Sequence, residues 1–131
     1  ADTIEVKKLF NSDIKDFITK AEIIQNAKVI NNNICLAYTK TETDNINIVI
    51  AQAADELLNI KEVEASFVLA RKDDRVFISA RSLGNINVHV LMENLGGGGH
   101  RDMAGAQLDT SLEKAYEMVK DTIQTCIKEE E

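Results

Sequence analysis

The chain of 131 residues contains no proline and no tryptophan, and only 5% of its residues are aromatic. A core must therefore be built mainly from Ile, Val, Leu and Ala, which the 44% apolar content can supply. That content excludes a largely disordered chain, and the length fits one domain. No apolar run reaches the roughly 20 residues of a membrane-spanning helix, and no signal peptide is recognisable.

Cysteine, histidine and basic residues are also scarce. Cys35 and Cys126 are too few for a disulfide framework or a zinc site, and their apolar neighbours predict buried free thiols in a reducing cytoplasm. Two histidines argue against a dinuclear metal site in this chain. The net charge of -7 opposes non-specific binding to nucleic acid and to anionic membranes, while leaving room for one locally basic pocket.

Apolar periodicity predicts helices at about 13–26, 44–59, 87–95 and 111–128. The expected N-caps are, in order, Ser12, Thr43, Asn87 and a capping box of Thr110 with Glu113. In the first helix, Ile14, Phe17, Ile18 and Ala21 form an apolar stripe at helical spacing, which we expect to face the core.

Short β-branched and apolar runs predict the strands. They are expected at 27–30, 34–38, 63–70, 75–81 and 104–108. Asn31-Asn32-Asn33 and Lys72-Asp73-Asp74 are typical of the tight turns that join such strands. The fold class is therefore α/β, a single domain with a mixed sheet of about five strands and about four helices. We expect this domain at 12–128, after a linker or remnant at 1–11 and before an acidic tail at 129–131.

Four of the six glycines are consecutive, at 96–99, and His100 follows them. Gly96 is placed to end the preceding helix, and the other three exceed what a helix end needs. A flexible linker would have polar flanks, whereas Leu95 precedes the run and Met103-Ala104 follow closely. Backbone N–H groups in such a loop form a concavity that binds anions, and an imidazole adds a donor. The run predicts a phosphate-binding loop, with a linker or a simple helix end as the alternative.

Arg81 ends the second strand of the predicted hairpin, on the same face as Phe77 and Ser79 because side chains alternate along a strand. A guanidinium can grip two phosphate oxygens at once, and strand ends often form the mouth of a site in α/β folds. Arg81 and His100 bracket a helix of about 13 Å. We interpret them as two contacts of one site; a solvated arginine is the alternative.

Other polar residues near the glycine run are weaker candidates. His89 lies beside an apolar stripe and is expected to be a partly exposed helix residue. Arg101 and Asp102 are either site residues or an exposed ion pair. Asn85 and Asn87 are typical of turns and N-caps, and Asn87 is also a candidate ligand contact.

Three motifs resemble the DHH-associated domain of DHH-family phosphoesterases. They are Ile78-Ser79-Ala80-Arg81-Ser82, Asn87-Val88 and Leu95-Gly96-Gly97-Gly98-Gly99-His100. Two further segments, Ala53-Ala54-Asp55-Glu56-Leu57-Leu58 and Val63-Glu64-Ala65-Ser66-Phe67-Val68, resemble the GdpP (YybT-like) branch, the membrane-anchored cyclic-di-AMP phosphodiesterases of Gram-positive bacteria. The resemblance covers about residues 12–127. It departs at Ala104-Gly105, where many relatives carry two alanines.

The resemblance implies a parent protein that cleaves cyclic-di-AMP to linear pApA, with two manganese ions in a preceding DHH domain. It also implies that this chain is a cytoplasmic domain of a parent anchored in the cell membrane. The positions that match the family's substrate contacts are Arg81, Ser82, Asn87, Gly97, Gly98, Gly99 and His100. Arg81 and His100 match phosphate contacts, and the glycines match a loop whose backbone lies against the nucleotide.

We therefore expect a substrate-binding domain with no catalytic residue, metal or cofactor of its own, and no hydrolytic activity in isolation. Its expected partners are a cyclic dinucleotide or short nucleotide, the preceding DHH domain and, as a candidate, a second copy of the chain. Three alternatives stay open. They are the same domain of an oligoribonuclease/3′-phosphoadenosine-phosphate phosphatase, a non-catalytic nucleotide- or RNA-binding module, and a dimerisation domain with an inert loop.

Overall fold

The computed structural model describes residues 3–130, and the side chains of residues 14–127. Its elements are, in order, α1 (Thr3–Gln25), β1 (Lys28–Ile30), β2 (Ile34–Thr39), α2 (Ile46–Leu57), β3 (Ala65–Lys72), β4 (Arg75–Ser82), α3 (Val88–Glu93), β5 (Gly98–Gly99), β6 (Met103–Leu108) and α4 (Leu112–Glu130). The predicted α/β class with a mixed sheet is confirmed. The strand beyond the expected five is β5, which lies inside the glycine run.

The sheet has the order β1-β2-β3-β4-β6-β5. Only β2 and β3 are parallel, because α2 connects them, and every other neighbouring pair is antiparallel. The β1–β2 turn contains Asn31 at φ 53° and Asn32 at φ 70°, and the β3–β4 turn contains Asp73 at φ 52° and Asp74 at φ 65°. Both predicted turns are thus confirmed, with the left-handed residues that suit the twist of a hairpin.

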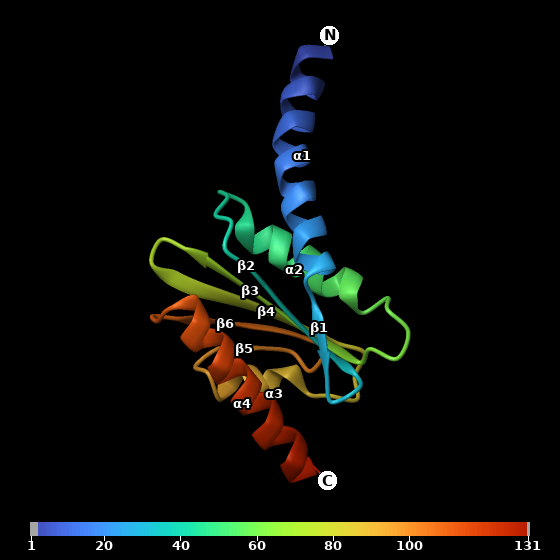
Figure 1. The fold of residues 1–131 in the computed structure, drawn as a ribbon, viewed down its shortest axis with the longest axis vertical. Coiled ribbons are helices and arrows are strands. Elements are labelled where there is room, and N and C mark those ends of the chain that lie inside the picture. Colours follow the sequence, from blue (N-terminus) through green and yellow to red (C-terminus); the bar gives the residue numbers. More distant parts are fainter. Residues whose placement is uncertain (1–2, 131) are drawn as a thin grey trace.

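Helices cover the two faces of the sheet unequally (Figure 1). The core beneath α3 and α4 takes side chains from β2, β3, β4 and β6. The core beneath α1 and α2 takes side chains from β2 and β3, with Phe77 of β4 at its border. Within residues 14–127, β6 therefore contributes to one core only. On the α2 side, α2 packs against part of β4, and β6 and β5 are left largely without a helical cover.

The first helix differs from the expectation in its start and in its buried face. It begins at Thr3, so the backbone of 3–11, expected to be a linker or a remnant of a preceding domain, is helical. Ser12 lies inside the helix instead of at its N-cap. The face that packs on the domain carries Thr19 and Ile23, both buried. The predicted stripe points outward, with Phe17 65% exposed. The prediction that it faces the core is wrong.

Two predicted N-caps are also wrong. The cap of α2 is Asn45, and the hydroxyl of Thr43 is buried without a hydrogen-bond partner among the described residues. At α4 the hydroxyl of Ser111 accepts a hydrogen bond from the backbone N–H of Lys114 at 3.1 Å, which replaces the expected box that starts at Thr110. α4 then continues to Glu130, so the backbone at 129 and 130 is helical; residue 131 lies outside the described residues.

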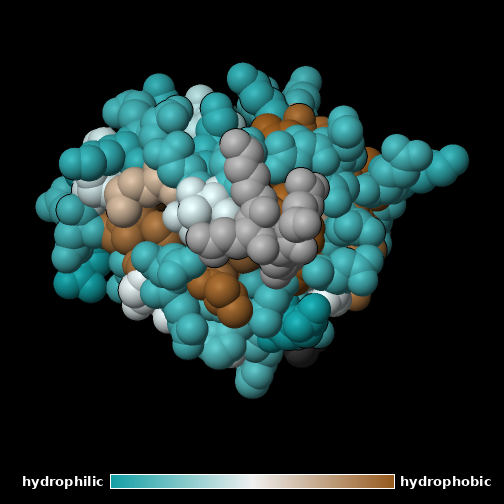
Figure 2. Space-filling view, turned by 90° about the horizontal axis from the view of Figure 1, so that it is seen from below, coloured by the Kyte–Doolittle hydropathy of each residue, from teal (hydrophilic) through white to brown (hydrophobic). Residues whose placement is uncertain are grey.

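The surface is mainly hydrophilic, in keeping with 28% charged residues. Figure 2 shows the end of the molecule at which α4 finishes, where apolar residues form separate patches among hydrophilic ones. No helix within residues 3–130 combines the length and apolar character that crossing a membrane requires.

Candidate functional site

The uncovered face of β4, β6 and β5 is organised in rows of residues that lie opposite one another. Directly opposite residues on paired strands point to the same face of a sheet. The rows are Arg81 with Met103, Ser79 with Gly105 and Gly98, and Phe77 with Gln107. Successive rows are about 6.8 Å apart along the strand. The middle row has small side chains or none, so the face is low in the centre and carries larger groups at both ends.

A groove of about 570 Å³ lies over this face. Its lining residues are Asn47, Ile50, Arg75, Phe77, Ile78, Ser79, Gly96, Gly97, Gly105, Ala106 and Gln107. Helix α2 forms one wall, and the glycine run forms the opposite wall. Among the residues predicted from the sequence, Gly97 lines the groove directly, and Arg81 lies one row beyond Ser79 on the same face.

The four consecutive glycines differ in backbone conformation and in surroundings. Gly96 has φ +85°, and the backbone N–H groups of Gly96 and Gly97 donate to Glu93 and Met92, which closes the end of α3 as predicted. A Cβ on Gly97 would lie 2.0 Å from the carbonyl oxygen of Gly105.

Gly99 and Gly98 contrast with each other. Gly99 combines φ +143° with a Cβ position 2.5 Å from the Ala104 Cα. A Cβ on Gly98 would meet nothing within 4 Å. Only Gly98 thus has neither a left-handed φ nor a close contact that requires glycine.

Arg81 is held rigidly from two sides. Its Nε donates to Asp55 Oδ1 on α2 at 2.9 Å, and its Nη1 donates to the Ala80 carbonyl at 2.9 Å. The side chain is 11% exposed. None of the described residues accepts a hydrogen bond from Nη2. The terminal edge of the guanidinium, formed by Nη1 and Nη2, is therefore the part that remains for an anion.

The backbone of His100 is hydrogen-bonded to the row that contains Arg81. Its N–H donates to the Met103 carbonyl at 2.7 Å, and Met103 lies opposite Arg81. The imidazole is exposed. Ser82 is buried, and its hydroxyl accepts a hydrogen bond from the Gly84 N–H at 2.9 Å, so it holds the turn after β4. The structure thus brings Arg81 and His100 to one edge, and it gives Ser82 a role in the adjoining turn.

The weaker candidates serve mainly as structural contacts. The Asn87 carboxamide oxygen accepts hydrogen bonds from the N–H groups of His89 and Val90, which confirms Asn87 as the N-cap of α3. His89 is partly exposed, as predicted, and pairs with Glu93 at 3.0 Å. Arg101 donates to the Gly84 carbonyl at 2.7 Å. It therefore secures the loop after β4.

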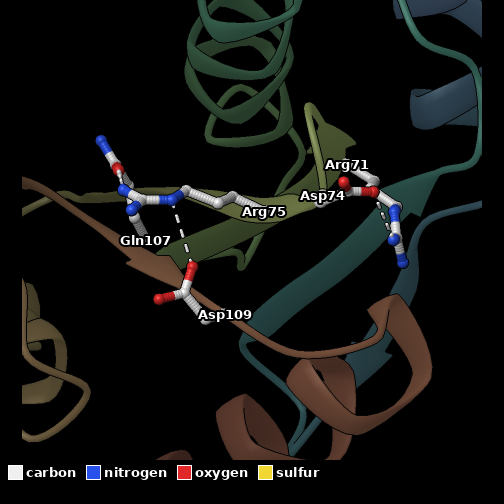
Figure 3. Close-up of polar contacts among 5 residues, drawn as sticks. All are labelled: Arg71, Asp74, Arg75, Gln107 and Asp109. Atoms are coloured by element: carbon white, nitrogen blue, oxygen red, sulfur yellow. Dashed lines mark hydrogen bonds and ion pairs between the residues drawn. The ribbon is translucent and has the colours of Figure 1, made fainter.

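The far end of the groove contains a polar cluster that the sequence reasoning missed (Figure 3). Arg75 donates through Nη1 to Gln107 Oε1 at 3.2 Å and pairs through Nε with Asp109 at 3.1 Å. Phe77, half-buried beside them, is the one aromatic residue among 14–127 that lines the groove. Strand alternation already placed Phe77 on the face of Arg81. Gln107 could not be found in the same way, because its neighbour is set by the pairing of β4 with β6.

The two cysteines are free and buried, as predicted. Burial raises the pKa of the Cys35 thiol, and Cys126 Sγ accepts a hydrogen bond from Asn94 at 3.2 Å. Within the part of the chain that the structure describes, no group of three or more His, Cys, Asp or Glu side chains is arranged to hold a metal ion.

The DHHA1 domain model matches residues 31–129, which include the five strands β2 to β6 and leave out β1. The chain belongs to the DHHA1 domain family.

Two relatives show which branch of the family the chain resembles. The chain is 42% identical over 127 residues to the cyclic-di-AMP phosphodiesterase GdpP of Bacillus subtilis, covering 94% of this chain and 19% of that protein. It is 38% identical over 117 residues to the cyclic-di-AMP phosphodiesterase PdeA of Listeria monocytogenes, covering 88% of this chain and 18% of that protein. The chain thus spans about a fifth of these curated relatives.

A solved structure has the same fold. An exopolyphosphatase-related protein from Bacteroides fragilis superposes with a TM-score of 0.74 at 21% identity, covering 84% of this chain and 34% of that one. At that identity the likeness concerns the fold.

Proposed function

We propose that this chain is the substrate-binding domain of a metal-dependent phosphodiesterase that hydrolyses cyclic-di-AMP to pApA. The catalytic DHH domain belongs to the rest of the parent protein. The similarity to GdpP and PdeA supports the substrate. The observation that carries the proposal is the groove itself, which has the glycine run as one wall and a fixed arginine, Arg81, one row beyond its lining residue Ser79.

In this proposal the row of Arg81 binds the phosphate. Asp55 and the Ala80 carbonyl hold the guanidinium, so little side-chain freedom is lost when its two Nη groups grip phosphate oxygens. The exposed imidazole of His100 supplies a second donor at the same edge, and the open side of Gly98 lets the ligand approach the backbone.

The rest of the parent supplies the chemistry. Manganese ions in its DHH domain would activate water and stabilise negative charge on phosphorus. This chain then orients the scissile phosphate and closes the groove to solvent from the opposite side. A parent anchored in the cell membrane, with this domain in the cytoplasm, is part of the same proposal.

Titration of the chain with cyclic-di-AMP, followed by NMR, tests the binding role. Arg81→Ala is expected to weaken binding about tenfold or more, because a charge-assisted hydrogen bond is lost. Arg71→Ala is the matched control, since Arg71 pairs with Asp74 at the hairpin tip, away from the groove. Equal affinities of the Arg81→Ala variant and the unchanged chain would refute the assignment.

A second candidate is the same domain in an oligoribonuclease or 3′-phosphoadenosine-phosphate phosphatase. The named relatives favour the cyclic substrate. Rates of the parent on cyclic-di-AMP and on linear dinucleotides, measured side by side with manganese, separate the two. Faster hydrolysis of the linear dinucleotides would favour the second candidate. The chain alone is expected to hydrolyse neither.

A further inference from the structure

The groove extends well beyond its phosphate end. Arg81 and Phe77 are four residues apart on one strand, so their Cα atoms are about 13 Å apart. A free phosphate at Arg81 would leave the middle row and the far end empty. The groove therefore suits a ligand that carries a second, larger group some distance from its phosphate.

The far end has the two features that recognise a planar base. One is Phe77, a half-buried aromatic residue that lines the groove and also packs against the core beneath α2. Bases stack on such rings, whatever their sequence, because every base has a π-face. The low middle row of Ser79, Gly105 and Gly98 leaves space for a sugar between the ring and Arg81.

The other feature is the Gln107 amide, whose orientation is fixed by Arg75. A guanidinium only donates hydrogen bonds, so the oxygen of the amide must face Arg75, as observed at 3.2 Å. The –NH₂ group is thereby turned away from Arg75 (Figure 3). Asp109 holds Arg75 on its Nε side at 3.1 Å. Gln107 thus presents donors, and an acceptor on the ligand is required to meet them.

We propose that Phe77 and Gln107 bind the base of the nucleotide, by stacking and by a hydrogen bond to a purine acceptor, with Arg75 as the residue that positions Gln107. This inference rests on the proposed function, because it assumes that Arg81 binds the phosphate. It assigns base recognition to residues outside the glycine run. It also makes β4 the element that sets the distance between the phosphate and the base.

The test uses NMR titrations of the chain with cyclic-di-AMP and with ribose 5-phosphate, a probe that has no base. Phe77→Leu keeps an apolar side chain on the core and removes the ring, and should weaken cyclic-di-AMP binding about tenfold. Gln107→Met removes the donors at similar size, and should weaken it about three- to tenfold. Neither change should alter the affinity for ribose 5-phosphate by more than about twofold, a shift below 0.5 kcal/mol.

Two matched controls lie away from the groove. Phe17→Leu changes an exposed phenylalanine of α1, and Gln124→Met changes a glutamine of α4 that pairs with Asn31. Both should bind cyclic-di-AMP as the unchanged chain does. Gln107 is exposed, so its variant folds even if Phe77→Leu lowers stability.

The outcomes separate the two proposals. If Arg81→Ala loses cyclic-di-AMP while Phe77→Leu and Gln107→Met keep it within twofold, base recognition lies elsewhere and the proposed function stands. If Arg81→Ala leaves the affinity unchanged, or the unchanged chain shows no binding at millimolar cyclic-di-AMP, both proposals are overturned. Equal losses for both probes in the Phe77 and Gln107 variants would show a general structural effect and overturn base recognition alone.

Discussion

The two faces of β4 lie in different environments, and alternate residues of the strand point to each. Val76, Ile78 and Ala80 are buried beneath α3 and α4, whereas Ser79 and Arg81 point to the opposite face, which α2 covers only in part. Because side chains alternate, neighbours in sequence belong to different environments. The comparison shows that one strand can place residues for stability on one face and candidate residues for recognition on the other. No separate loop or domain is needed for the two purposes.

The largest expected effect comes from adjacent substitutions on the two faces. Ile78→Ala leaves a cavity in the packed core and should lower the free energy of unfolding by about 2–5 kcal/mol. Ser79→Ala, on the open face, should change it by less than about 0.5 kcal/mol. Urea unfolding followed by circular dichroism measures both. Similar losses for the two variants would contradict the separation.

Within the glycine run the same contrast is expected between Gly97 and Gly98. A Cβ on Gly97 would meet the backbone of β6, so Gly97→Ala should cost about 1–3 kcal/mol of stability or more. A Cβ on Gly98 would have no atom within 4 Å. Gly98→Ala should therefore be neutral or stabilise the chain by about 0.5 kcal/mol, because alanine lowers the conformational entropy of the unfolded state. Cyclic-di-AMP titration should then show weaker binding for Gly98→Ala. Unchanged binding would mean that the open side of Gly98 does not face the ligand.

Asn87 has two candidate roles, as the N-cap of α3 and as a ligand contact, and substitutions can separate them. Its carboxamide oxygen caps α3, so Asn87→Ala should lower stability by about 0.5–2 kcal/mol. Asn87→Asp keeps the acceptor and should restore most of that loss. Thermal unfolding of the two variants measures both changes in stability. A stable Asn87→Ala chain that loses cyclic-di-AMP would instead identify a ligand contact.

A small effect on stability is expected for Asp55, whose pair with Arg81 lies beside the open face. Its carboxylate is 59% exposed, so Asp55→Asn should cost only about 0.2–1 kcal/mol. Cyclic-di-AMP affinity should fall nonetheless, because the Nε side of Arg81 loses a charged partner. Asp74→Asn, at the hairpin tip, is the control for removal of a carboxylate. A loss of stability without any loss of affinity would assign the pair to folding alone.

Sequence reasoning succeeded where the signal is local. The left-handed Asn and Asp turns, the end of α3 at Gly96 and the alternation along β4 follow from the chemistry of a few neighbouring residues. It failed for α1, where the apolar stripe that includes Phe17 is exposed and Ile23 is buried. Helical spacing identifies an apolar stripe, but only the packing of α1 against α2 decides which face is covered.

The candidate site shows the same division. Arg81 and His100 were predicted as candidates because a guanidinium and a glycine run have specific chemistry. The glycine run was less specific than it looked, since Gly97 and Gly99 are required by their contact with β6. Gln107 and Asp55 carried no local signal. Each gains its role from a partner that is distant in sequence, Arg75 and Arg81 respectively.

The amino-acid sequence by itself determined the α/β class, the turns, the strand faces and the family to which the chain belongs. These depend on periodicity and on the conformations that each residue allows, which are properties of short segments. The tertiary structure alone decided that the α2 side of β6 and β5 is left largely without a helix, which glycine stays open, and which residues lie at the far end of the groove. Those features depend on strand order and register, which bring together residues that no local pattern connects.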